Sequence, residues 1–284
     1  LIGHMSIDQF DFQTSESIAV RLDQLAGKVS GEDSSPSPWA AELRARAQLR
    51  QRDAKGAIGF LDPALARFPT MRSLLALRAA ASAGAFDLSD ADARIGAFDS
   101  LSTGVPLSAL ALYEVGRTLS DNRQYELSDA YLLRAIEREP HWAEPLIDRG
   151  LMLAQAGRDV ESLDTLGRAR ELDPFNVAVD NSTKLLTELL QYERFESEHF
   201  IVRCKPGRDT ILAKEMLPAL ESMHARVCGA ERGGIDFEPP VKTTIDLMPN
   251  HEWFSVRITG VPGLHTMAAA TGPIVAMESP SDGP

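Results

Sequence analysis

The sequence predicts a mainly α-helical protein, in which a superhelix of stacked helix pairs is followed by a small α/β domain. Two observations predict this fold class. A pattern of small and large residues recurs between residues 38 and 194, and repeats of this kind stack into solenoids. After Arg194 the hydrophobic period changes to short strands that alternate with helices, which is typical of an α/β unit.

The repeat is defined by residues that return at a fixed interval. Gly116 and Gly150 are 150 − 116 = 34 positions apart, and Pro140 and Pro174 have the same separation. An upstream copy ends at Pro69 and keeps the same internal offsets, whereas residues 70–106 form a degenerate copy whose register the sequence does not define. The prolines predict where the second helix of each copy ends, because proline lacks an N–H and disfavours helix in the preceding residue.

Small residues in each copy predict where two helices cross, because a larger side chain there would hold the backbones apart. These positions are Ala45, Gly116 and Gly150 on the first helices and Ala57, Ser128 and Ser162 on the second. Leucines four residues after the second set are expected to fill the space between the helices: Leu61, Leu132 and Leu166.

These offsets resemble those of the tetratricopeptide repeat (TPR), a pair of antiparallel helices. The resemblance implies a TPR-type solenoid over residues 38–194, with about four repeats and a capping helix within 175–192. Residues 1–37 precede it. They begin with Leu1–Met5, which read as a cloning remnant, and continue into a short helix at 17–26 and a Ser- and Pro-rich linker.

The resemblance also implies a concave groove, lined by the first helix of each repeat, in which a partner peptide lies. The repeat offsets assign to it Trp39, Glu42, Arg46, Arg50, Tyr113, Arg117, Asp121, Glu144, Ile147, Leu151 and Gln155. The arginines and Tyr113 suit an acidic or aromatic peptide, whereas the Lys/Asn set with which some TPR domains clamp a C-terminal carboxylate is not matched. The same helix faces could instead be solvated or packed against the C-terminal domain, and the sequence leaves these alternatives open.

Residues 195–284 predict a separate domain with strands at 199–204, 241–247 and 274–277 and helices at 209–228 and 251–258. Four segments of this domain define its pattern: F-E-S-E-H-F-I-V-R at 195–203, T-I-D-L-M-P at 244–249, T-G-V-P-G-L at 259–264 and G-P-I-V-A-M-E-S-P at 272–280. Their order resembles the front part of peptidase-MA-like (gluzincin) domains, which often follow TPR arrays in bacterial proteins. In that family the next element carries the zinc motif HExxH, which is not reached here. The resemblance therefore implies that a longer protein could be a TPR-coupled zinc metallopeptidase.

The pair His251-Glu252 is the one local candidate for zinc chemistry. HExxH needs a second histidine four residues on, so that both ligands share a helix face, but position 255 is Ser255. We therefore interpret residues 250–258 as a helix that Asn250 caps and Glu252 stabilises at its N-terminus. The other histidines, His141, His199, His224 and His265, show no ligand spacing along the chain.

Composition limits the remaining functions. A net charge of −12 disfavours a nucleic-acid or anionic membrane surface, and no apolar run reaches the length of a membrane span. Two cysteines cannot make a disulfide framework, so the compartment stays open. We expect a protein-protein interaction module with no catalytic residues and no cofactor in this chain. The alternative is the non-catalytic N-terminal part of a zinc metallopeptidase.

Overall fold

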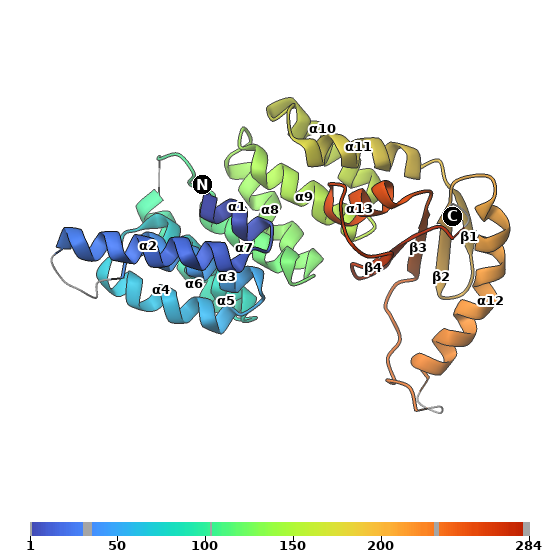
Figure 1. Ribbon diagram of the computed structural model, residues 1–284, viewed down its shortest axis with the longest axis horizontal. Helices are drawn as coiled ribbons and strands as arrows, with labels where there is room; N and C mark the ends of the chain where they lie inside the picture. Colours follow the sequence, from blue (N-terminus) through green and yellow to red (C-terminus); the bar gives the residue numbers. More distant parts are fainter. Residues whose placement is uncertain (1, 31–35, 103, 230–232, 281–284) are drawn as a thin grey trace. The chain divides into compact units, whose positions relative to one another are not determined.

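The computed structural model describes residues 2–30, 36–102, 104–229 and 233–280, and it confirms a mainly helical chain followed by a small mixed sheet (Figure 1). The chain forms two compact units, residues 1–145 and 146–284. Among the described residues, no helix combines the length and the apolar character that crossing a bilayer requires.

The first unit consists of helices that pack in consecutive pairs: α3 on α4, α5 on α6 and α7 on α8. Short turns join the members of each pair, which brings them side by side. The helices are α1 (Ile2–Asp8), α2 (Phe12–Ser30), α3 (Pro38–Arg50), α4 (Ala54–Arg67), α5 (Arg72–Gly84), α6 (Leu88–Ser102), α7 (Leu110–Asp121) and α8 (Tyr125–Arg138).

The second unit begins with α9 (Ala143–Gln155), α10 (Asp159–Leu172) and α11 (Val177–Leu189). The repeat interval is visible in these bounds, because α8 and α10 both have 14 residues and begin 159 − 125 = 34 positions apart. Helices α4, α8 and α10 each end two residues before a proline, as the sequence predicts. Helix α11 lies within the segment expected to cap the last pair.

The predicted role of the small residues is confirmed at two matching helix crossings. A Cβ atom added to Gly116 would lie 2.7 Å from the Leu132 side chain, and one added to Gly150 would lie 2.5 Å from that of Leu166. The hydroxyls of Ser128 and Ser162 donate to the carbonyls of these glycines at 2.8 and 2.7 Å. The backbones therefore approach closely only because no side chain stands between them.

The N-terminal segment differs from the prediction. The helix expected at 17–26 is the longer α2, and α1 was not predicted at all. Four residues of the segment interpreted as a cloning remnant, 2–5, therefore belong to a described helix, since α1 begins at Ile2. The predicted linker falls largely on residues 31–35, which lie outside the described residues.

The sheet has the strand order β1-β2-β3-β5-β4 within the described part of the chain. Strands β2, β3 and β5 are parallel and match the predicted ones, whereas the antiparallel edge strands β1 and β4 were not predicted. Edge strands of three or four residues are too short to show a hydrophobic period. The bounds are β1 (Glu193–Glu196), β2 (Phe200–Cys204), β3 (Thr243–Met248), β4 (Ala268–Ala270) and β5 (Ile274–Glu278).

Alternation along the strands gives the sheet two different faces. Val202 and Cys204 of β2 lie with Ile245 and Leu247 of β3 in one apolar cluster, against α12 (Asp209–Val227). The residues between them, Arg203 and Asp246, therefore point to the opposite face, on the side of α10 and α13 (His251–Thr259).

Helical periodicity in 209–228 predicts a buried face of Ile211, Leu212, Met216, Leu220, Met223 and Val227, and α12 buries only part of it. Leu212, Met216 and Leu220 pack on the sheet, but Ile211, Met223 and Val227 are exposed by 72%, 52% and 52%. A helix of 19 residues is about 28 Å long, whereas the five residues of β2 span about 17 Å. The C-terminal part of α12 thus extends beyond the strands (Figure 1), and Ala213 replaces Ile211 on the buried side.

Candidate functional site

Four of the expected groove residues meet around one hollow of the first unit. Arg46 and Arg50 reach it from α3, and Arg117 and Asp121 reach it from α7. The repeat offsets did not assign the remaining residues of the helix pairs that line it, which are Leu49, Leu77, Glu114 and Thr118.

Helix α1, at the start of the chain, also lines this hollow. Ile7 is buried among apolar residues of α2 and α3, with an exposed fraction of 4%. The next residue, Asp8, accepts a hydrogen bond from Arg117 at 2.8 Å. Two residues further on, the Phe10 ring lies 4.6 Å from the guanidinium of Arg50, a cation–π contact. Ile7 and Asp8 thus form part of the wall of the hollow, and Phe10 packs against one of the arginines that line it.

Two arginines of α3 pair with acids of α7 that also line the hollow. Arg46 pairs with Glu114 at 2.7 Å, and Arg50 pairs with Asp121. Burial alone would lower the pKa of Arg46. The neighbouring carboxylates, Glu114 above all, outweigh burial, so that the pKa of Arg46 is raised above its ordinary value. The acid that pairs with Arg117, in contrast, comes from α1.

The other expected groove residues of the first unit are placed differently. The Trp39 ring is exposed by 63%, and Glu144 is exposed. Glu42 bridges to Arg46 at 3.4 Å. Tyr113 is buried and packs edge-on against Trp142, with ring centroids 4.8 Å apart. Tyr113 therefore supports the helix packing and does not present its ring to a ligand.

In the second unit, helix α13 covers the expected groove residues. Gln155 donates from Nε2 to the carbonyl of Ile258 at 3.2 Å. A Cβ atom on Gly260 would lie 3.3 Å from Leu151, and Ile147 is buried. Leu151 and Gln155 therefore follow the packed alternative, in which the α/β part of the same unit contacts the helix face, and Ile147 is too buried to present its side chain to a peptide.

His251 has a structural role, which agrees with the interpretation from sequence. Its Nε2 lies 2.6 Å from the carbonyl oxygen of Leu264, and its Nδ1 lies 3.1 Å from a carboxylate oxygen of Glu278. A carbonyl can only accept, so Nε2 carries a proton and has no lone pair for a metal. Asn250 caps the helix as expected, by accepting from the backbone N–H of Trp253 at 2.9 Å.

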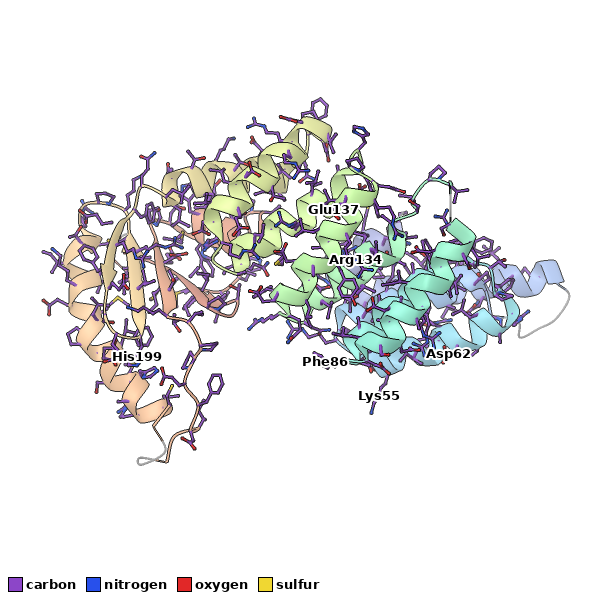
Figure 2. The ribbon with its side chains drawn as sticks, turned by 180° about the vertical axis from the view of Figure 1, so that it is seen from behind. Lys55, Asp62, Phe86, Arg134, Glu137 and His199 are labelled. Atoms are coloured by element: carbon purple, nitrogen blue, oxygen red, sulfur yellow. The ribbon has the colours of Figure 1, made fainter. Side chains whose placement is uncertain are left out.

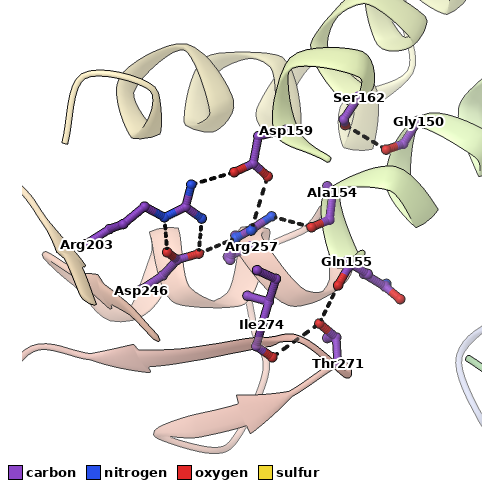
Figure 3. A network of polar contacts seen from close by, with 10 residues as sticks. All are labelled: Gly150, Ala154, Gln155, Asp159, Ser162, Arg203, Asp246, Arg257, Thr271 and Ile274. Carbon is purple, nitrogen blue, oxygen red and sulfur yellow. Dashed lines mark hydrogen bonds and ion pairs between the residues drawn. The ribbon is translucent and has the colours of Figure 1, made fainter. Parts of the chain in front are cut away.

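A buried charge network joins the far face of the sheet to helices α9 and α10 (Figure 3). Arg203 donates to both carboxylate oxygens of its cross-strand neighbour Asp246, at 2.6 and 2.9 Å, and to Asp159 at 2.6 Å. Arg257 donates to Asp246 and to the carbonyl of Ala154, both at 2.8 Å. Two positive and two negative side chains thus balance in the interior.

Titration behaviour follows from this arrangement. Burial alone would raise the pKa of Asp246, but the guanidinium groups of Arg257 and Arg203 outweigh it and hold that pKa below its ordinary value. Asp246 therefore remains an acceptor for two arginines, of which Arg257 is held almost entirely out of water. The network is a structural tie between the helices and the sheet.

A second polar cluster of this unit lies where β2 begins and α12 ends. His199 directly precedes β2 (Figure 2), and His224 lies near the end of α12. Their rings stack, with centroids 3.8 Å apart. The carboxylate of Glu238 lies 3.5 Å from Nε2 of His199 and 3.3 Å from Nε2 of His224. The Nδ1 of His199 lies 2.6 Å from Glu221.

Sequence reasoning missed this cluster because its members are far apart along the chain. His199 and His224 are separated by 224 − 199 = 25 positions, which matches no local ligand motif. They meet because α12 runs back along the sheet after β2. In the charge network, one signal was present: Arg203 and Asp246 each interrupt an otherwise apolar strand, and a buried charge requires a partner.

The chain was compared with protein-family models and with curated proteins, and no match was found in either comparison. Its function is therefore inferred from the geometry of the chain itself.

Proposed function

We propose that this chain is an interaction module of the TPR type, without catalysis of its own, whose first unit binds a short protein segment. The observation that carries the proposal is that α1 lines a hollow together with α3 and α7. In the segment Ile7-Asp8-Gln9-Phe10, the apolar side chain packs against α2 and α3, the acidic one pairs with Arg117 and the aromatic one packs on Arg50. We infer that the preferred partner carries the same pattern.

The charges of the hollow favour one carboxylate over an acidic run. Arg46 and Arg50 are already paired with Glu114 and Asp121, so a further acid beside them would meet two carboxylates. Arg117, with a side chain exposed by 33%, pairs with the acid that α1 delivers. Affinity would then come from burying the apolar residue, and orientation from the carboxylate.

The test is competition between α1 and the same sequence supplied as a separate peptide. We expect a labelled peptide of residues 6–12 to bind the wild-type chain weakly, because a tethered segment has a high effective concentration. The double variant Ile7→Asp/Asp8→Lys should release α1 and increase peptide affinity at least about tenfold. Fluorescence anisotropy measures both affinities.

Adding Arg117→Glu to the released chain should remove this gain, because the peptide carboxylate would face a negative charge. Arg134→Glu is the matched control, since Arg134 lies on α8 and does not line the hollow (Figure 2). Arg46 is unsuitable for charge reversal, because its loss would leave Glu114 buried and unpaired. Equal binding by the wild-type and released chains, or by the Arg117→Glu and Arg134→Glu versions, would contradict the proposal.

A second candidate function is the non-catalytic front of a TPR-coupled zinc metallopeptidase. The observation that favours it is the element order of the α/β part, since β2, α12, β3, α13 and β5 follow one another in the order that the resemblance implies. Reading the genomic sequence that encodes this chain tests it. An HExxH motif after residue 284 supports the candidate, and a stop codon or an unrelated sequence removes it.

A further inference from the structure

We propose that the α/β part binds a zinc ion through Nε2 of His199, Nε2 of His224 and the carboxylate of Glu238. These three ligand atoms lie within 4.8 Å of one another. The site belongs to the second unit and is independent of the peptide-binding proposal for the first. It is also distinct from the His251-Glu252 pair.

The separations between the Glu238 carboxylate and the two histidine nitrogens are those of neighbours around one metal. Zinc bonds of about 2.0–2.1 Å at a tetrahedral angle place ligand atoms about 3.3–3.5 Å apart. The Glu238 oxygen lies 3.3 Å from Nε2 of His224 and 3.5 Å from Nε2 of His199. Charge-assisted hydrogen bonds between these groups would be shorter, about 2.7–2.9 Å. The carboxylate is therefore placed as a co-ligand.

The Nε2 atom of His224 is buried and makes no hydrogen bond. The side chain as a whole is exposed by only 10%, and the 3.3 Å approach of Glu238 lies outside hydrogen-bond geometry. A buried polar atom without a partner is costly, and in native proteins it indicates a ligand, an ion or a catalytic role. A metal at this point would use its lone pair.

Glu221 prepares His199 for the same ion. Its carboxylate lies 2.6 Å from Nδ1 of His199 and also accepts the backbone N–H of that residue at 2.9 Å. An ionised carboxylate only accepts, so Nδ1 carries the proton and Nε2 of the neutral ring keeps its lone pair. A carboxylate behind a metal-binding histidine is the usual second contact of such sites, because it fixes the tautomer and the ring orientation.

Binding requires one ring to turn. The two imidazoles are nearly parallel, with planes 14° apart, so the in-plane lone pairs of the two Nε2 atoms do not converge. Glu221 holds the ring of His199, whereas no hydrogen bond fixes Nε2 of His224. Rotation about the Cβ–Cγ bond of histidine is soft. We therefore assign the movement to His224.

The donor set favours a transition metal. Two imidazole nitrogens and one carboxylate suit zinc, whereas calcium and magnesium prefer oxygen ligands alone. Iron(II) accepts the same donors, so it is the competitor against which zinc is tested. The exposed carboxylate of Glu198 lies 4.0 Å from Nε2 of His199. It can occupy the fourth position, which otherwise belongs to water.

Zinc titration of the whole chain against a chromophoric chelator tests the site. We expect one zinc ion per chain, with a dissociation constant in the micromolar range or tighter. His199→Gln and His224→Gln should each weaken binding at least about tenfold, the lower end of the losses seen for perturbed metal sites. Cobalt substitution reports the geometry, because a tetrahedral site gives an intense visible absorption that both variants should lose.

Two histidines outside the cluster provide matched controls. His265→Gln removes an exposed histidine, and His4→Gln removes the one near the chain start; neither should change zinc binding.

Two carboxylates of the cluster sharpen the test. Glu238→Gln alters a side chain exposed by 62%, so it should weaken binding without unfolding the chain. Glu221→Gln, which changes a positioning residue, should weaken binding about 10- to 100-fold. No stoichiometric zinc, or binding that survives both His199→Gln and His224→Gln, would overturn the proposal.

Discussion

The two units both contain arginines paired with carboxylates, but they use these pairs differently. In the second unit, Arg203 and Arg257 meet two aspartates in a network that excludes water almost completely. In the hollow of the first unit, Arg117 takes its acid from α1, and both side chains of that pair are partly exposed. Arginine–carboxylate pairs therefore stabilise the fold of the second unit, whereas in the first unit such a pair forms a contact that can exchange.

Desolvation explains the difference. A buried charge that loses its partner cannot recover water, so every member of the closed network is needed. A partly exposed pair exchanges its partner for water at little cost. The hollow therefore suits reversible binding, and the closed network suits a permanent connection between helix and sheet. This comparison predicts large losses of stability for changes in the network and small ones for changes in the Arg117–Asp8 pair.

The largest effect should follow Asp246→Asn. The amide keeps the shape of the carboxylate but leaves Arg203 and Arg257 with excess buried charge, so we expect the free energy of unfolding to fall by about 3–5 kcal/mol. Urea denaturation measures it. Asp180→Asn is the control, because the Asp180–Lys184 pair is exposed, and it should leave the free energy of unfolding nearly unchanged. Similar losses of unfolding free energy in the two variants would contradict the distinction between buried and exposed pairs.

Acid should weaken the closed network. The pKa of Asp246 is lower in the folded chain than in the unfolded one, so its contribution is present above the ordinary carboxyl pKa of about 3.9 and is lost as the pH falls through the lowered folded value. Below about pH 4, the wild type should therefore lose stability more steeply than Asp246→Asn. Unfolding free energies at several pH values measure the two slopes, and parallel curves would contradict the assignment.

The smallest effect should follow Asp8→Asn. Its pair with Arg117 is partly exposed, so we expect the free energy of unfolding to change by only about 0.2–1 kcal/mol. The visible consequence should be local: α1 should leave the hollow more often, and its backbone amides should exchange hydrogen faster. Hydrogen exchange measures this directly. Slower or unchanged exchange in α1 would contradict the role of Asp8 in holding that helix. A loss of unfolding free energy as large as that of Asp246→Asn would mean that the first unit also depends on a closed network.

Much of the helical fold could be predicted from sequence, because its signals are local. The interval between Gly116 and Gly150 located two helix crossings, and the prolines located the ends of α4, α8 and α10. Asn250 likewise predicted the start of α13, which it caps. Helix α1 escaped prediction because seven residues provide too few turns for a hydrophobic period to emerge.

The candidate sites could be predicted only in part. The offsets placed Arg46, Arg50 and Arg117 on one helix face, but they did not show that Glu114 and Asp121 would neutralise two of the three. They also could not distinguish an open groove from a face packed within the chain, because both need a similar mixture of polar and apolar residues. Helix α13 decided that question for Leu151 and Gln155.

The sequence by itself determined the helical character of the first part, the change to an α/β unit after Arg194 and the serine at the position of a second zinc ligand beside His251, because each depends on residues close together along the chain. Only the tertiary structure decided which charges meet and which histidines converge. Strand pairing placed Arg203 opposite Asp246, and the return of α12 along the sheet brought His224 to His199. Such contacts depend on the path of the chain in space, which no local spacing encodes.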